Sequence, residues 1–176
     1  MEKLLAISAL GPQEEASARE LSEVVSEAGG DIRDARMTQL GNSFGALLLV
    51  NGNWHAMNKV RTALERYAKR TGCEISVSET ASREPQAPAA PYHVEAVALE
   101  RDNLVLALVS FFARRELAVA EVHARRYNAP STGAAMLAVR LEVHVPREVG
   151  IAVLREDFHD FCDKNNLDAV IEPIHG

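Results

Sequence analysis

The sequence has few of the features that mark secreted, membrane or metal-binding proteins. Its two cysteines, Cys73 and Cys162, lie far apart, and neither has a second cysteine nearby to complete a zinc motif or a redox pair. We interpret both as buried, unreactive thiols. The segment after Met1 has neither a long apolar run nor a small-residue cleavage site. We therefore expect a cytoplasmic protein with no membrane span.

Catalytic signatures are also missing. The chain has no G-x-S-x-G turn, no phosphate-binding glycine loop, no C-x-x-C pair and no H-E-x-x-H helix. We therefore expect no enzymatic activity and no cofactor. Several histidines and carboxylates in the second half form the one pattern that suggests a divalent metal. A metal site needs three or four ligands that converge on one point, and alternation along strands gives such patterns without that convergence. A solvated sheet face is therefore the favoured interpretation. These polar residues are His93, Glu121, His123, Arg125, Arg140, Glu142 and His144.

Positive charge is scarce as well. The formal net charge is −6, with nine basic and eleven acidic residues in 1–80 and nine and thirteen in 91–176. Binding to a phosphate backbone relies on clustered Lys and Arg, and RNA-binding sheets add aromatic platforms. The densest basic stretch is Arg114-Arg115 followed by Arg125-Arg126, which we interpret as charges at a helix end and along a strand. The sequence therefore predicts no direct binding of nucleic acid.

What the chain does contain is an internal duplication. Residues 5–40 and 92–127 keep the same chemical classes in register at an offset of 87. A repeat of this kind indicates two copies of one structural unit. The matched pairs include Ile7 with Val94, Ala9 with Ala96, Leu21 with Leu108, Ile32 with Val119 and Asp34 with Glu121. A hydrophobic content of 47% and a charged content of 25% are typical of a globular protein.

Each copy predicts the order strand, helix, strand, strand, helix, strand. In the first copy we expect strands at 4–10, 31–40, 44–50 and 73–78, with helices at 18–28 and 54–71. In the second copy we expect strands at 92–99, 119–127, 134–145 and 169–174, with helices at 103–115 and 147–165. This order is typical of the ferredoxin-like α+β fold, an antiparallel sheet with both helices on one face.

The boundary between the copies is marked by composition. Residues 81–91 contain three prolines and little apolar weight, so we expect an extended linker between domains at 1–80 and 92–176. Within each copy the apolar alternation of the second strand shifts by one residue at the same place. A period of two allows such a shift only with an extra residue. We therefore predict a β-bulge near Arg33-Asp34 and another near Ala120-Glu121.

Several runs of residues resemble the glycine cleavage system transcriptional repressor family, whose members consist of two ACT domains. In the first copy these are residues 28–37, Leu40-Gly41, Phe44 and residues 50–56, and in the second copy residues 111–115 and 127–133. The resemblance covers nearly the whole chain. It implies tandem ACT domains and regulation that responds to an amino acid. It also implies action on a separate transcriptional activator, without a DNA-reading module.

The resemblance further implies an amino-acid site at the turn after the first strand of each copy and on the adjoining strand. The matching positions are Gln13, Ala16, Asp31, Glu100 and Asn103. The family's turn carries a proline and a final glycine that both turns here lack.

The residues present at these turns disfavour an amino-acid ligand. In the first copy Glu14 and Glu15 place negative charge where a ligand carboxylate would seek free N–H groups. The alternative is that Glu14, Glu15, Glu100 and Asp102 cap the helices that follow. We therefore expect glycine to bind weakly, or not at all, at the first turn.

The favoured function is a non-enzymatic regulatory protein that acts through protein contacts and is gated by glycine or another small amino acid. The alternative is a regulatory or assembly subunit of an amino-acid metabolic enzyme. Both functions require a protein partner, and the sequence does not separate them. The number of subunits stays open, and a homodimer is compatible with either function.

Overall fold

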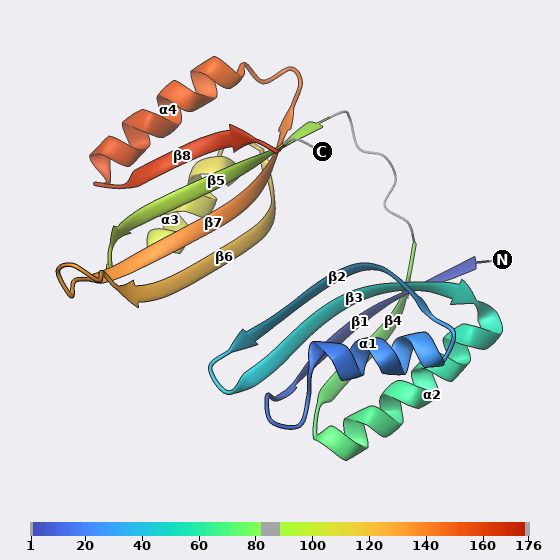
Figure 1. Ribbon diagram of the computed structural model, residues 1–176. Helices are drawn as coiled ribbons and strands as arrows, with labels where there is room; N and C mark the ends of the chain where they lie inside the picture. Colours follow the sequence, from blue (N-terminus) through green and yellow to red (C-terminus); the bar gives the residue numbers. More distant parts are fainter. Residues whose placement is uncertain (1, 82–88, 175–176) are drawn as a thin grey trace. The chain divides into compact units, whose positions relative to one another are not determined.

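The computed structural model describes residues 2–81 and 89–174. These residues form two compact units, one in each range (Figure 1). Both units have the predicted order βαββαβ, and in both the sheet has four antiparallel strands. The predicted α+β, ferredoxin-like fold class is therefore confirmed. No helix in the described part of the chain is long and apolar enough to cross a membrane.

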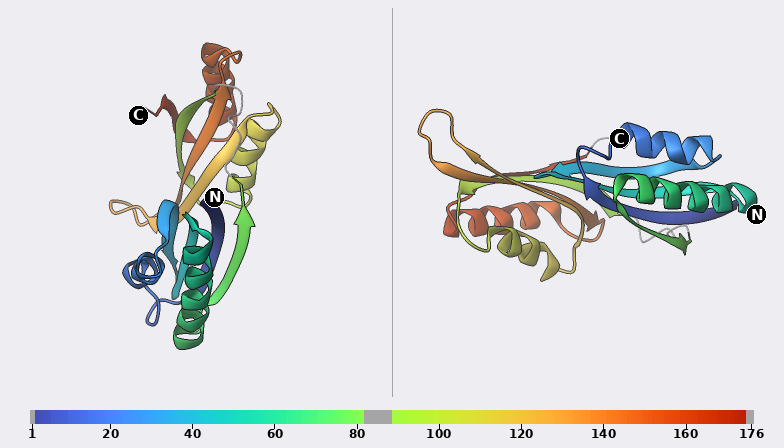
Figure 2. Two further views of the ribbon diagram at one scale, coloured as in Figure 1. Left: turned by 90° about the vertical axis from the view of Figure 1, so that its right-hand side faces the viewer. Right: turned by 90° about the horizontal axis from the view of Figure 1, so that it is seen from below.

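The first unit places its strands in the order β2-β3-β1-β4. Both of its helices cover one face of this sheet, as Figure 1 and Figure 2 show. Its strands are β1 (Glu2–Pro12), β2 (Asp31–Leu40), β3 (Ser43–Asn53) and β4 (Glu74–Thr80), and its helices are α1 (Ala18–Glu27) and α2 (Trp54–Thr71). Helix α2 ends at Gly72, whose φ of 70° lies in the left-handed region that closes helices.

The second unit repeats the arrangement with the strand order β6-β7-β5-β8. Its strands are β5 (Ala89–Leu99), β6 (Ala118–Asn128), β7 (Ala135–Pro146) and β8 (Asp168–Pro173), and its helices are α3 (Leu104–Ala113) and α4 (Ile151–Lys164). Helix α4 begins later than predicted because a turn follows Pro146, in which the Val149 N–H donates to the Pro146 carbonyl at 3.0 Å. Helix α3 ends at Ala113, two residues before the predicted end.

Strand β5 begins three residues earlier than the sequence predicts. Residues 89–91, which we expected in the linker, extend β5, and Pro91 pairs with His144 of β7. The Pro91 carbonyl accepts from the Ile174 N–H at 2.9 Å, on the β8 side of the strand. Because the N and C=O of one residue face the same side of an antiparallel strand, the missing proline donor costs no bond to β7. Residues 82–88 of the predicted linker lie outside the described residues.

Both predicted β-bulges are confirmed. The pairing of β2 with β3 shifts register between Ile32 and Asp34, and that of β6 with β7 shifts between Val119 and Glu121. The extra residue lets the apolar side chains on both sides of it face the same core. The predicted alternation of the long strand β7 also holds, with Leu137, Val139, Leu141, Val143 and Val145 buried.

Each unit has its own hydrophobic core, and the two cores are filled differently. In the second unit Phe111 and Phe112 pack edge to face at 5.0 Å between ring centroids, and Phe158 lies 5.4 Å from Phe112. The first unit has no phenylalanine in its helices. There Gly30 allows close packing, since a Cβ atom at this position would lie 2.8 Å from a Val50 methyl group. The residue 87 positions later is Leu117, which is buried in the second core.

Candidate functional site

The predicted ligand turn of the first unit lies between β1 and α1. The Gln13 N–H donates to the Asn42 carbonyl at 3.0 Å, and Ala16 is only 3% exposed. Helix α1 is capped by Ser17, whose hydroxyl accepts from the Glu20 N–H at 3.2 Å. The interpretation that Glu14 and Glu15 cap this helix is therefore wrong, because both lie in the exposed turn before Ser17.

Asp31 lies at the other end of the first unit's sheet. It begins β2 and pairs with Asn51, whereas Gln13 lies beside Asn42, beyond the end of the same strand. A strand of this length spans roughly 30 Å. Within the unit, Gln13 and Asp31 therefore cannot touch one small ligand together. The Asp31 carboxylate instead pairs with Arg33, with 3.2 Å between Oδ2 and Nε.

In the second unit the structure brings the two predicted residues to one turn. The Glu100 N–H donates to the Ala135 carbonyl at 2.8 Å, and its carboxylate pairs with Arg126 at 2.9 Å. Asn103 begins α3 with a φ of 61°, and its side chain forms no capping hydrogen bond. The Glu100 carboxylate binds Arg126 of β6, so it does not cap helix α3.

The polar residues considered for a metal lie on the outer face of the second sheet, away from its helices. Glu95 accepts from His93 at 3.1 Å and from Arg140 at 2.9 Å, while Glu142 and His144 form a separate pair at 3.0 Å. The hydrogen bond from His93 and the charge of Arg140 lower the pKa of Glu95. Within residues 2–81 and 89–174, no three His, Cys, Asp or Glu side chains are grouped to hold a metal ion. This geometry favours the solvated polar face.

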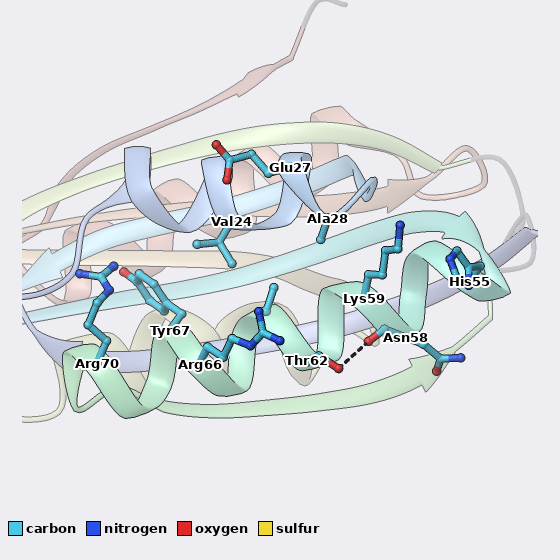
Figure 3. Close-up of a pocket in the computed structure, with 11 residues that line it drawn as sticks. Val24, Glu27, Ala28, His55, Asn58, Lys59, Thr62, Arg66, Tyr67 and Arg70 are labelled. Atoms are coloured by element: carbon cyan, nitrogen blue, oxygen red, sulfur yellow. Dashed lines mark hydrogen bonds between the residues drawn. The ribbon is translucent and has the colours of Figure 1, made fainter.

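A groove with no local sequence motif lies on the helix face of the first unit (Figure 3). It lies between α1 and α2, has a volume of about 620 Å³, and has Val24, Glu27 and Ala28 on its α1 side. The α2 side is basic, since the helix carries five Lys and Arg and a single Glu. From His55 to Arg70 the groove follows α2 for roughly 22 Å. The α2 cations that line it are Lys59, Arg66 and Arg70, which we call the basic stripe.

Two cations of the basic stripe are available for binding. Among the described residues, Lys59 and Arg66 have no ion-pair partner, while Arg70 lies 3.6 Å from the Glu20 carboxylate. The Arg70 guanidinium also lies 5.3 Å from the ring centre of Tyr67. Tyr67 is 2% exposed, and its hydroxyl has no hydrogen-bond partner in the described part of the chain. Burial raises the pKa of Tyr67.

The equivalent groove of the second unit lies between α3 and α4, has a volume of about 530 Å³, and is lined by an arginine that is bound within the unit. The Arg115 guanidinium donates to Asp157 at 2.9 Å and to the Phe111 carbonyl at 3.1 Å. It also lies 3.8 Å from the centre of the Phe111 ring. Asp157 and Asp160 of α4 offset part of the positive charge of Arg114, Arg115 and Lys164 in this groove. The two helix grooves therefore share a position in the fold and differ in how far their cations are paired.

The basic stripe was missed because its residues are not adjacent in the sequence. The sequence pointed to Arg114-Arg115, the densest linear run, whereas Lys59, Arg66 and Arg70 are separated by seven and four residues. These spacings place side chains on one face of a helix. Counting charge along the helical period of α2 would have found them.

The order of elements, the strand order and the register of both sheets define the class: the protein consists of two tandem ferredoxin-like domains. In agreement, residues 3–78 match the ACT domain family. The chain is also similar, at 24% identity over 97% of its length and 90% of the relative, to the glycine cleavage system transcriptional repressor of Escherichia coli (strain K12). The same figures hold for the repressor of Shigella flexneri. The resemblance noted in the sequence is therefore confirmed.

Solved structures support the fold over the whole chain. A crystal structure provisionally named as a glycine cleavage system transcriptional repressor has a TM-score of 0.71 at 21% identity, with 100% of this chain and 99% of that chain covered. A protein of unknown function from Galdieria sulphuraria has a TM-score of 0.80 at 17% identity, with 99% and 100% covered. At these identities the likeness establishes the fold alone.

Proposed function

We propose that this protein is a non-enzymatic, cytoplasmic regulator of transcription that responds to a small amino acid and acts by binding another protein. One observation carries the proposal: the similarity to a transcriptional repressor extends over 97% of the chain, through both ACT units. The described residues of both units are taken up by the two βαββαβ folds. Within them no helix remains to form a separate DNA-reading module.

The basic stripe is the surface that best suits such a protein contact. Lys59 and Arg66 are unpaired in the described chain and border an apolar groove, a combination that fits an acidic, partly apolar segment of a partner. Nucleic acid fits this surface less well. Helix α1 places Glu20 and Glu27 beside the stripe, and these carboxylates would repel a phosphate backbone that extends past the groove.

A deletion strain tests the regulatory role. Transcripts of the glycine cleavage genes are measured with and without added glycine in three strains: the parent, the deletion, and the deletion that carries the wild-type gene. We expect derepression in the deletion and restored repression in the complemented strain. Transcript levels that do not differ between parent and deletion would contradict a regulatory role in this system.

A binding experiment tests the protein-contact mechanism. The purified chain is titrated against a labelled promoter fragment of the glycine cleavage genes at physiological salt, with a scrambled fragment as control. We expect no difference between the two fragments, because the net charge of −6 disfavours specific duplex binding by the chain alone. A sequence-dependent complex that survives physiological salt would overturn this part of the proposal.

A further inference from the structure

A second cavity of the first unit lies on the outer face of its sheet, opposite the helices. It has a volume of about 670 Å³ and is formed at the end of the sheet where β2 begins. Asn51 of β3 and Leu4 of β1 are paired across this end, so their side chains share the outer face. The cavity is distinct from the turn that holds Gln13, which lies roughly 30 Å away along β2.

Asn51 is the unusual residue of this cavity. It is 7% exposed, and its amide nitrogen donates to the Glu2 carboxylate at 3.2 Å. Its amide oxygen is buried and, among the described residues, accepts no hydrogen bond. A buried acceptor without a donor is unfavourable, and such groups are rare in folded proteins. The cavity therefore lacks a hydrogen-bond donor at a defined position.

Charged groups of both signs lie around the same cavity. Glu2 offers a carboxylate whose one partner among the described residues is Asn51. Arg33, the residue of the β-bulge, is held through its Nε by Asp31 at 3.2 Å. An arginine has five N–H donors, so the outer edge of this guanidinium remains free to bind a second carboxylate. The cavity thus presents acceptors at Asn51 and Glu2 and donors at Arg33, while Lys3 and Glu79, which also line it, pair with each other at 3.0 Å.

We propose that this cavity binds a free α-amino acid with an apolar side chain, which would be the ligand that the proposed function requires. The ammonium group donates to the Asn51 amide oxygen and to Glu2, and the carboxylate accepts from Arg33. The side chain lies against Leu4 and Leu49, which are half-buried in the cavity wall. A volume of about 670 Å³ is far larger than glycine needs, so the site favours leucine over glycine.

Calorimetry on the full chain tests the site with L-leucine, glycine and two analogues that each lack one charged group. These are 4-methylpentanoate, which lacks the ammonium, and 3-methylbutylamine, which lacks the carboxylate. We expect leucine to bind at least tenfold more tightly than glycine or either analogue, because only leucine fills all three parts of the cavity. Absence of leucine binding, or equal binding of 4-methylpentanoate, would overturn the proposal.

Two variants and a control locate the binding. Asn51→Leu removes the acceptor, and Arg33→Gln removes the guanidinium; each should weaken leucine binding at least tenfold. Asn128→Leu, at an exposed position of the second unit, should leave it unchanged. Because the Asn51 oxygen has no partner, Asn51→Leu should keep or raise the melting temperature. If Asn51→Leu does not fold, Arg33→Gln decides alone, and unchanged leucine binding in it refutes the site.

This outcome is separable from the test of the proposed function. Calorimetry reports binding whether or not the chain regulates transcription, and the deletion strain reports regulation whether or not leucine binds. Derepression in the deletion strain together with no leucine binding would refute the cavity and leave the regulatory role intact. Leucine binding without derepression would support the cavity and refute the regulatory role.

Discussion

The two units have the same order of elements and differ at their surfaces. On the helix face, Lys59 and Arg66 in the groove of the first unit have no ion-pair partner among the described residues, whereas Arg115 in the groove of the second unit is bound to Asp157. On the outer sheet face, the first unit exposes Leu10 and Leu47 at 54% and 60%. The second unit carries ion pairs such as that of Glu95 with Arg140 on the same face, beside Leu99 and Val170, which are 65% and 49% exposed.

The difference separates what the fold requires from what the surface is free to change. Buried positions keep their class in both copies, because each unit needs its own core to stay folded. Exposed positions have diverged in charge, because a surface substitution costs little stability. Lys59 and Arg66 of the basic stripe, which have no ion-pair partner among the described residues, therefore mark a place to look for binding.

The largest difference in stability between the two units is expected from a substitution in the aromatic core of the second unit. Phe112 is fully buried and contacts Phe111 and Phe158. Phe112→Ala should lower the free energy of unfolding of this unit by about 3–5 kcal/mol, because it leaves a cavity. Urea unfolding followed by residue-resolved hydrogen exchange should show the loss in residues 89–174 only. An equal loss in 2–81 would contradict two separate cores.

A smaller change in stability is expected at the equivalent positions Gly30 and Leu117. Leu117→Ala should cost about 2–5 kcal/mol, because the second core is built around this side chain. Gly30→Ala should cost about 1–3 kcal/mol for the opposite reason, since its Cβ would press on Val50 and Val25. Urea midpoints of the two variants measure both effects. A Gly30→Ala protein as stable as wild type would show that the first core has room to spare.

Substituting the arginines of the two grooves should change the free energy of unfolding by less than the core substitutions do. Arg115→Ala should cost about 1–2 kcal/mol, because the side chain loses the Asp157 pair, a carbonyl hydrogen bond and the Phe111 ring. Arg70→Ala should cost less than about 0.5 kcal/mol, since its contact with Glu20 is long and exposed. Thermal unfolding of both variants, with Asp157→Ala in a double-mutant cycle, checks the ranking. A larger loss for Arg70→Ala would contradict the conclusion that Arg115 is the more firmly bound of the two arginines.

The smallest effect is a pH dependence of the second sheet's outer face. The pKa of Glu95 is lower in the folded chain than its usual value of 4.5 because of His93 and Arg140. A carboxyl group with a lowered pKa contributes stability above its unfolded pKa and loses it as the pH falls through the folded pKa. Glu95→Gln should therefore flatten the decline in stability below about pH 4.5. An unchanged acid limb would mean that these contacts are not formed in solution.

Much of the fold could be predicted from the sequence because the core repeats. The offset of 87 and the periods of two and 3.6 gave both units, and the shift of parity after Ile32 and Val119 gave both bulges. Element ends were less predictable. The start of β5 depends on a proline that faces away from β7, and such geometry has no signal in composition.

The candidate sites were less predictable than the fold. Resemblance placed Gln13 and Asp31 at one site, but strand direction places them at opposite ends of β2. The basic stripe and the Asn51 cavity bring together residues that are distant in the sequence, so no local motif marks them. An unsatisfied amide oxygen, in particular, is visible only once its neighbours are placed.

The most direct test of the central claim compares the two helix grooves in the regulatory assay. Lys59→Glu with Arg66→Glu reverses the basic stripe, and Arg114→Glu with Lys164→Glu makes the same change of charge in the second groove. Both proteins should fold, because all four side chains lie on helix surfaces or helix ends. In the deletion strain, we predict that the first variant fails to restore repression of the glycine cleavage genes and that the second restores it. Full repression by the first variant would contradict the assignment of the partner contact to the groove between α1 and α2.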